Sequence, residues 1–525
     1  MYLATVSMNL VALHRLNDFR YIVPFHCFVS LSQDLRSQLY ELYYFNLISA
    51  KSRSKLEDIA CAALSANAIT QVTKVFHQYL NFITLERDTF ILSNQNEELI
   101  SYHAINKPDI MDTEMEAIMD TIVDSLFCFF VTLGTVPIIR CPRGNAAEMV
   151  AVKLDKKLRE NLRDARNSLF TGDNMGAGQF SFRRPLFVLS DRNLDLATPL
   201  HHTWTYQTLI HDVLDFHLNR VNMDESVGSE ASPAGARPKK TNKKSYVLTA
   251  ADMFWQKHKG SPFPEVAESV QEELDTYRAQ EDEVKRLKSI LVSVDEGAIS
   301  SISMSDNTAK LTSAVSSLPE LMEKKRLIDH TNVATAVLDH IKSRKLDVYF
   351  EYEEKLMSKS TLDRSLLDII GDPDGRCATV LILARNDRNH AYVCYFVKGW
   401  KYLRCLLFSR VMNSGSQFVM ERMKHLVLKQ HNLPVTRILD NLMEMKSNPE
   451  NDDYRYFDPK MLRGSESSIP RNKNPFQEVS YRLHGGRRVN YVEYQNLVDY
   501  TKVKPGKRVL YGCSELFNLS SLGQK

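Results

Sequence analysis

The sequence is poor in the features that mark secreted, zinc-binding and nucleic-acid-binding proteins. Its eight cysteines are scattered, none of them forms a C-x-x-C pair, and no cysteine–histidine spacing suits zinc. We therefore interpret them as reduced thiols of a cytosolic protein. The formal net charge is only +3, from 67 basic and 64 acidic residues in a chain of 525. This balance gives no electrostatic reason to expect a nucleic-acid partner.

Long apolar runs and phosphate-binding motifs are also missing. The N-terminus carries no basic region before its short apolar run, so we expect no signal peptide. The most apolar segment, Ile122 to Ile139, is interrupted by Asp124 and Pro137 and divided at Gly134, which predicts a buried helix followed by a strand. The glycine-rich stretch from Gly172 to Gly178 lacks the spacing of a phosphate loop. We expect no cofactor, no metal, and contact with membranes only through partners.

One stretch, PLFVLSDRNLDLATPLHHTWTYQTLIHDVLDFHLNR, organises the rest of the chain. Its apolar run from Leu186 to Leu189 predicts a strand buried on both faces, as in a parallel sheet. The strand ends in the charged pair Asp191 and Arg192. Apolar residues three or four apart then predict a helix over 209–220. A strand, a polar turn and a helix in this order indicate an α/β fold.

Two groups of residues in this stretch allow an enzymatic interpretation. Asp191 and Asp195 could act as an acid pair or supply a nucleophile, but no glycine-rich or lysine-bearing motif accompanies them. His201, His202, His211 and Asp212 could hold a metal, yet a regular helix would place His202 and His211 on opposite faces. We interpret the residues after the strand as a buried hydrogen-bonded network that ties strand to helix. An α/β enzyme stays open as an alternative.

Three motifs of this stretch closely resemble the signature of the SM (Sec-one/Munc-eighteen) family: DRNLD, PLHHTWTYQ and HD. The flanking residues are similar to its Sly-type branch of ER–Golgi transport. The residues that match the signature are Asp191, Arg192, Asp195, Pro199, His202, Tyr206 and Asp212. The resemblance implies a protein that performs no known chemistry. Instead it binds a Golgi-type syntaxin and its SNARE complex, and assists SNARE assembly in vesicle docking and fusion. It also implies a cytoplasmic protein that is peripheral on ER and Golgi membranes.

The resemblance further implies an α/β fold of three domains arranged as an arch. Domains 1 and 2 would contain parallel α/β sheets, and domain 3 would be largely helical. The corresponding ranges are 1–100 for a domain 1 that lacks its N-terminal part, 101–246 for the first part of domain 2, 247–431 for domain 3, and 432–525 for the second part of domain 2.

Residues 55–84 predict two amphipathic helices, the second of them over 72–80, and such helices most often face a core. The Sly-type resemblance implies a second role for this surface. There the N-terminal peptide of the cognate syntaxin would place a hydrophobic anchor in an apolar slot. The residues of this slot would be Leu56, Ile59, Ala60 and Val72, with Phe76 added from the spacing.

Two long helices are expected in domain 3. Apolar residues at helical spacing predict one helix from Val266 onward and another over 318–341, where Pro319 marks a helix start or a kink. The family resemblance implies a helical hairpin that contacts SNARE motifs here. The family resemblance also implies tethering complexes as partners beside the syntaxin. A tethering adaptor that binds coiled coils without SNARE specificity is a further alternative.

Overall fold

The computed structural model of the chain describes residues 10–16, 19–25, 35–36, 42–47, 53–92, 100, 102–105, 109–164, 169–170, 184–195, 198, 203–225, 242–294, 318–344, 346–347, 350, 382–385, 392–395, 432–446, 448–449, 453–461, 478–485 and 491–514. His201, His202, Pro199 and the glycine-rich stretch 172–178 lie outside this described part. The chain forms two compact units. Unit 1 comprises Met1–Asp195, Asn432–Val489 and Asn496–Leu516, and unit 2 comprises Leu196–His431, Asn490–Gln495 and Phe517–Lys525.

The larger sheet of unit 1 has seven strands in the order β14-β7-β8-β15-β16-β6-β5. Its strands are β5 (Phe82–Glu86), β6 (Thr89–Leu92), β7 (Ile138–Cys141), β8 (Leu186–Asp191), β14 (Arg455–Phe457), β15 (Glu478–Gly485) and β16 (Arg508–Cys513). The five inner strands are parallel, and only β5 and β14 at the two ends are antiparallel to their neighbours. Every residue of β8 is buried, which confirms the buried parallel strand predicted at Leu186.

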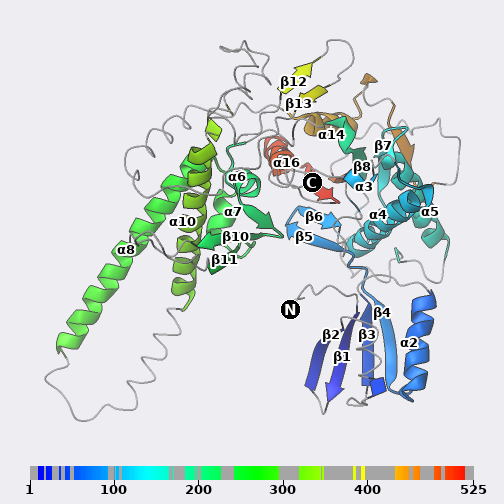
Figure 1. Ribbon diagram of the computed structural model, residues 1–525, viewed down its shortest axis with the longest axis horizontal. Coiled ribbons are helices and arrows are strands. Elements are labelled where there is room, and N and C mark those ends of the chain that lie inside the picture. Colours follow the sequence, from blue (N-terminus) through cyan, green and yellow to red (C-terminus); the bar gives the residue numbers. More distant parts are fainter. Residues whose placement is uncertain are drawn as a thin grey trace, which may run out of the picture. The chain divides into compact units, whose positions relative to one another are not determined.

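Two helices pack against this sheet, as Figure 1 shows: α4 (Asp112–Leu133) and α5 (Ala146–Arg163). The rings of Phe130 in α4 and Phe187 in β8 meet nearly at right angles, with centroids 5.0 Å apart. Helix α4 ends where Gly134 adopts a φ of 65°, a conformation that glycine reaches without a steric penalty. The apolar segment 122–139 is therefore a buried helix followed by strand β7, as predicted. Within the described residues no helix is both long and apolar enough to span a membrane.

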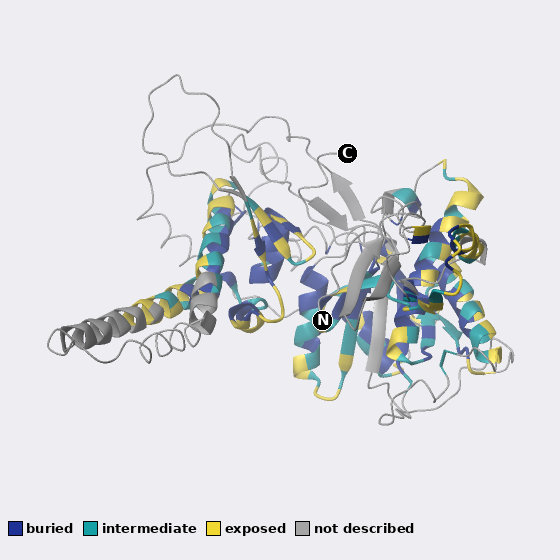
Figure 2. Cartoon of the chain, turned by 90° about the horizontal axis from the view of Figure 1, so that it is seen from below, coloured by how far each residue is buried: buried dark blue, intermediate teal, exposed yellow. Residues whose placement is uncertain are grey.

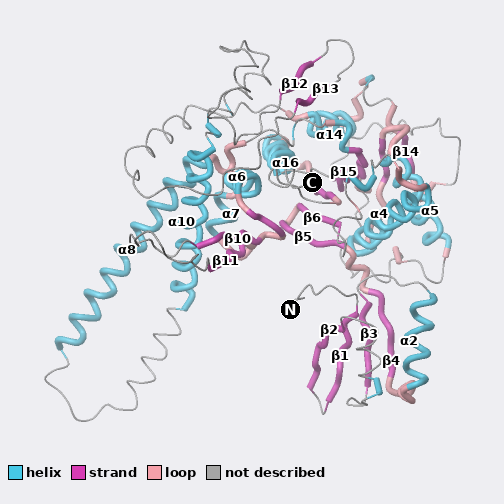
Figure 3. Tube along the Cα trace, in the orientation of Figure 1, coloured by secondary structure: helices cyan, strands magenta, loops and turns pink. Residues whose placement is uncertain are grey.

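Unit 1 also contains a four-stranded sheet in the order β2-β1-β3-β4, which is visible in Figure 3. Its elements are β1 (Leu10–Leu16), β2 (Phe19–Phe25), β3 (Leu42–Leu47) and β4 (Val72–His77), with α2 (Arg53–Ser65) connecting β3 to β4. Only the β3–β4 pair is parallel, so this sheet is mixed. The prediction of a helix over 72–80 was wrong, because residues 72–77 form strand β4. Valine, threonine and phenylalanine favour a pleated strand, and the apolar spacing that suggested a helix comes from a bulge between the first two residue pairs of β3 and β4.

Unit 2 combines helices with small antiparallel sheets. Its elements include α6 (Tyr206–Val213), β9 (Asp215–His217), β10 (Arg220–Glu225), β11 (Asn242–Val247), α7 (Met253–His258), α8 (Phe263–Val294), α10 (Leu318–Arg344), β12 (Ile382–Arg385) and β13 (Tyr392–Tyr395). The prediction of one helix over 209–220 is wrong: the helix ends at Val213, where Leu214 takes an extended backbone, and β9 follows. Leu218 and Asn219 then take positive φ angles and turn the chain from β9 into β10. Of the apolar residues spaced three or four apart over 209–220, only those up to Val213 lie in helix α6.

The two long helices predicted for this region are present. Helices α8 and α10 pack against each other, and α10 begins at Leu318, directly before Pro319. Beyond Val270 the described side chains of α8 are exposed or partly exposed, as Figure 2 shows. The remaining described elements are the 3-10 helix η2 (Arg192–Leu194) and the α-helices α3 (Tyr102–Ile105), α14 (Pro434–Met443) and α16 (Tyr491–Val503).

Candidate functional site

Helix α2 covers one face of strands β3 and β4. The core between them is a cluster of Leu35, Tyr43, Phe45, Ala63, Ala66 and Ala68. Ile59 of α2 and Val72 of β4 are partly buried and pack against this cluster. Ala60, the next residue along α2, is exposed. The α2 residues of the predicted slot thus span the transition from core to solvent.

The register of β4 separates the predicted slot residues into two groups. Val72 is paired with Tyr43 and Val75 with Phe45, so both valines face α2, because paired residues on neighbouring strands lie on the same face. Lys74 is paired with Tyr44, and Phe76 follows it by two residues, which places both on the opposite face. The Lys74 ammonium lies 6.0 Å from the centre of the Phe76 ring.

The structure places Ile59 and Val72 against one core cluster, with Leu56 and Ala60 in the same helix as Ile59, and leaves Phe76 on the other side of the sheet. Val75, which was not among the predicted slot residues, lies on the same face of β4 as Val72. Its alternation with Phe76 would have been a signal had 72–77 been assigned as a strand. We call Leu56, Ile59, Ala60, Val72 and Val75 the α2–β4 surface.

Two properties of the α2–β4 surface suit the capture of an extended peptide. Strand β4 stands at the end of the four-stranded sheet, and within the described residues it pairs only with β3. Apolar side chains are exposed in this part of the chain: Leu64 of α2 is 60% exposed, Ile69 before β4 49%, and Val75 of β4 41%. An unpaired strand edge offers backbone hydrogen bonds, and an apolar patch beside it accepts side chains.

The signature residues are divided between the two units. Asp191 is the last residue of β8 in unit 1, and Arg192 and Asp195 follow it; the three are 5%, 0% and 4% exposed. Tyr206 and Asp212 are buried in α6 of unit 2. Among the described residues no group of three or more His, Cys, Asp and Glu side chains could hold a metal ion.

Tyr206 belongs to a buried chain of hydrogen bonds within unit 2. Its hydroxyl lies 3.1 Å from Nδ1 of His330, and Nε2 of His330 lies 3.0 Å from Oδ2 of Asp252. The other oxygen of Asp252 accepts a 2.9 Å bond from the amide of Trp255 and so caps the start of α7. The three side chains connect α6, α7 and α10.

Burial and hydrogen bonding shift the pKa values of Tyr206 and Asp252 in this network. Burial, with a smaller contribution from the Asp252 charge, raises the pKa of Tyr206 well above its ordinary value. Burial alone would raise the pKa of Asp252, but the hydrogen bonds from His330 and the Trp255 amide outweigh it and lower that pKa. The order tyrosine–histidine–aspartate resembles a catalytic relay, yet Tyr206 and His330 have no exposed surface. Because a substrate cannot reach these groups, the role of the hydrogen bonds is to hold α6, α7 and α10 together.

His330 and Asp252 were not predicted from the sequence, although both leave a signal there. Asp252 stands three residues before Trp255 at a helix start, which is the spacing of an N-cap. His330 lies on the same helical stripe as the buried residues Val333, Val337 and Ile341. A polar side chain on an apolar stripe needs a buried hydrogen-bond partner.

Comparison with known proteins gives a consistent result. The model of the Sec1 family matches residues 15–525. Sec1 family domain-containing protein 1 of Homo sapiens is 69% identical, over 94% of this chain and 84% of that protein. The Protein sly1 homolog of Drosophila melanogaster is 47% identical, again over 94% of this chain and 84% of that protein.

Solved structures show the same fold at lower identity. The crystal structure of Sly1p in complex with an N-terminal peptide of Sed5p superposes with a TM-score of 0.63 at 23% identity, over 94% of this chain and 81% of that one. The SM protein Vps45 in complex with the Qa SNARE Tlg2 (1–310) gives a TM-score of 0.60 at 15% identity, over 95% and 84%. The α/β fold class predicted from the sequence is thereby confirmed.

Proposed function

The chain belongs to the Sec1 family, and from this membership we propose that it binds a Golgi-type syntaxin and its SNARE complex and assists vesicle docking and fusion between the ER and the Golgi. Relatives that carry the name sly1, and the solved complexes of Sly1p, Vps45 and Unc18 with a Sed5p peptide, a Qa SNARE and syntaxin 1, support the proposal. The protein acts by binding, and its cytoplasmic, peripheral position on ER and Golgi membranes follows from these partners. The division into three domains stays a prediction.

The main structural support for the proposal is that the apolar α2–β4 surface lies beside the outer edge of strand β4. We infer that it receives the N-terminal peptide of the syntaxin. Ile59 and Val72 are held by the core and form the floor of the site, while the small exposed Ala60 leaves room above them. Val75 extends the apolar contact along β4. The peptide backbone can pair with the outer edge of β4, so that an otherwise disordered tail gains both an anchor and a register.

Titration calorimetry of the full chain with a synthetic N-terminal peptide of a Golgi syntaxin tests this. The test variant is Ala60→Glu, because Ala60 is exposed and the change leaves the core intact, whereas Ile59 packs on the core cluster. We expect saturable one-to-one binding that weakens at least about tenfold in Ala60→Glu, since a carboxylate would have to be desolvated in the apolar contact.

The matched control is Phe76→Ser on the opposite face of β4. It removes an exposed apolar side chain of the same strand and should leave the affinity unchanged. Equal affinities of Ala60→Glu and the wild type would contradict the α2–β4 surface as the peptide site. Binding of unrelated coiled-coil helices as tightly as SNARE helices would favour the tethering adaptor instead.

A further inference from the structure

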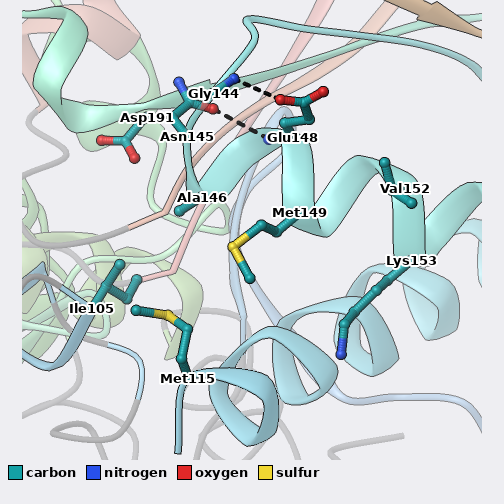
Figure 4. A pocket seen from close by; sticks show the side chains of 10 residues that line it. All are labelled: Ile105, Met115, Gly144, Asn145, Ala146, Glu148, Met149, Val152, Lys153 and Asp191. Atoms are coloured by element: carbon teal, nitrogen blue, oxygen red, sulfur yellow. Dashed lines mark hydrogen bonds between the residues drawn. The ribbon is translucent and has the colours of Figure 1, made fainter. Parts of the chain in front are cut away.

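A cavity of about 690 Å³ opens in unit 1 where α4 and α5 begin. Figure 4 shows its lining, which comes from four elements: Ile105 of α3, Met115 of α4, Met149 and Val152 of α5, and Asp191 at the end of β8. This volume lies within the range of about 300–1,000 Å³ that ligand pockets occupy. The cavity adjoins the carboxyl end of β8, the side of a parallel sheet on which α/β proteins place binding sites.

The lining is mainly apolar and partly open to solvent; its polar members are Asn145, Glu148, Asp191 and Lys153, whose ammonium is paired with Asp120. The side chains of Met115 and Met149 converge beside Ile105 in Figure 4. Met149 is 41% exposed and Val152 43%, and Met111, one helical turn before Met115, is 61% exposed. Methionine side chains are flexible and polarizable, so they adapt to apolar groups of different shapes. Exposed apolar side chains that border a cavity mark a place where a partner buries its own.

The start of α5 does not make this cavity a phosphate site. The side chain of Asn145 accepts from the amide of Glu148 at 3.2 Å, and the carboxylate of Glu148 accepts from the amide of Gly144 at 2.5 Å. This reciprocal cap already occupies the amides of Gly144 and Glu148, which an anion at the start of α5 would otherwise use. The hydrogen bond from Gly144 and the ion pair with Arg455 lower the pKa of Glu148, so its carboxylate is charged and would repel a phosphate.

The helix that borders the cavity is acidic. Helix α4 contains five carboxylates and no lysine or arginine: Asp112, Glu114, Glu116, Asp120 and Asp124. The two that lie farther along the helix are paired with α5, Asp120 with Lys153 at 2.7 Å and Asp124 with Lys157. The three near Met115 are exposed and have no basic partner within the described part of the chain. The apolar opening is therefore bordered by uncompensated negative charge.

We propose that this cavity and its acidic border bind a basic amphipathic segment of a partner protein. The apolar side chains of the segment enter between Met115, Met149 and Val152, and its lysine or arginine side chains lie against Asp112, Glu114 and Glu116. The same negative charge would repel an anionic membrane, which is why the occupant is a protein segment. This second docking site involves none of the residues of the α2–β4 surface and does not depend on the proposed function.

The test observes the methionines directly. The full chain is labelled with ¹³C at the methionine methyl groups and titrated with a synthetic amphipathic helix of leucine and lysine. We expect saturable shifts of the Met115 and Met149 signals and none for Met253, which is 71% exposed in unit 2. We expect the affinity to fall as salt is raised, because the charges are exposed.

Two comparison peptides and two variants separate the apolar from the electrostatic contribution. A peptide with glutamate in place of every lysine should not bind, and a scrambled leucine–lysine peptide of equal composition should bind at least about tenfold more weakly. The variant Met149→Ser/Val152→Ser should weaken binding to a similar extent, while the control Leu133→Ser, at the other end of α4, should not. The exposed charge variant Asp112→Asn/Glu114→Gln/Glu116→Gln should reduce both the affinity and its salt dependence.

Absence of the Met115 and Met149 shifts would overturn the proposal, and so would equal binding of the glutamate peptide. Unchanged affinity in both variants would do the same. Circular dichroism melting curves establish that each variant is folded. If Met149→Ser/Val152→Ser is unfolded, the charge variant still decides the outcome, because its three side chains are exposed and unpaired with basic groups in the described residues.

Discussion

The hydroxyl of Tyr206 lies 3.1 Å from Nδ1 of His330, a residue 124 positions away in the chain, and both side chains are completely buried. An ionised carboxylate can only accept, so Nε2–H of His330 donates to Asp252, and the other ring nitrogen, Nδ1, pairs with the Tyr206 hydroxyl. Each of the three groups thus satisfies the next. Tyr206, one of the residues that match the SM signature, thereby connects α6 to α10 and α7.

Replacing Tyr206 with phenylalanine tests this chain. The substitution keeps the ring but leaves Nδ1 of His330 without its hydrogen-bond partner in a buried environment. We expect the free energy of unfolding to fall by about 1–3 kcal/mol. Urea denaturation followed by circular dichroism measures it. Tyr44→Phe, on the four-stranded sheet, is the control and should change stability by no more than about 0.5 kcal/mol.

Arg184 holds the segment after β14 against the sheet. Its guanidinium donates to Asp458 at 2.6 Å and to the carbonyls of Pro137 and Val136 at 3.0 and 3.1 Å. We expect Arg184→Ala to cost about 3–5 kcal/mol, because Asp458 would keep a buried charge without its main partner. Arg184→Lys should recover little of the loss, since an ammonium cannot form the same fork of three bonds. Equal stability of the lysine variant and the wild type, measured by denaturant titration, would contradict this geometry.

Asp440 predicts an acid-dependent loss of stability. Burial alone would raise its pKa, but hydrogen bonds from Lys446, Lys504 and Tyr500 outweigh burial and lower it from 3.8 to about 2. A lowered folded-state pKa stabilises the native state above the unfolded pKa, and this contribution is lost as pH falls through the folded value. We expect the contribution to be complete above about pH 4 and to vanish toward pH 2.

The measurement is the free energy of unfolding by urea at pH 5, 4 and 3. Asp440→Asn should be less stable than the wild type at pH 5, and the difference should shrink as the pH falls. A difference between the two proteins that stays constant with pH would mean that Asp440 has the same pKa in the folded and unfolded chain.

The thiols should react in two classes. Among the described cysteines Cys61 is exposed on α2, whereas Cys128, Cys141 and Cys513 are buried. Burial, reinforced by the nearby Glu148 charge, raises the pKa of Cys141 to about 12, so its reactive thiolate is scarce at neutral pH. We expect a thiol reagent at pH 7.5 to modify Cys61 at once and Cys141 only after unfolding, as read by peptide mass spectrometry. Rapid modification of Cys141 in the folded protein would contradict its burial.

The sequence predicted those elements whose signals are local. Strand β8 is an unbroken apolar run, the α4–β7 boundary coincides with Gly134, and α8 and α10 have sustained helical periods. The wrong predictions arose where the spacing of apolar residues in a strand or a turn resembles the spacing in a helix. A bulged strand over 72–77 and a helix followed by a turn at Leu218 both repeat apolar residues every three or four positions.

The candidate site was predicted only in part, for the same physical reason. Leu56, Ile59 and Ala60 follow from one helical face, but whether Val75 or Phe76 joins them is decided by the pairing of β4 with β3, which depends on tertiary contacts. The partners of Tyr206 are equally non-local: Asp252 is 46 positions away from it and His330 is 124. A single sequence carries the types of these residues but not their distances.

The order of strands in the larger sheet of unit 1 has a consequence for synthesis. Strand β15 lies between β8 and β16 and pairs with both, yet about 290 residues separate it in the chain from β8. At roughly 5–20 residues per second a ribosome needs about 15–60 s to make that interval. During this time β8, buried throughout in the finished protein, has no β15 beside it. The nascent chain therefore carries an apolar strand with one unpaired edge until the C-terminal strands emerge.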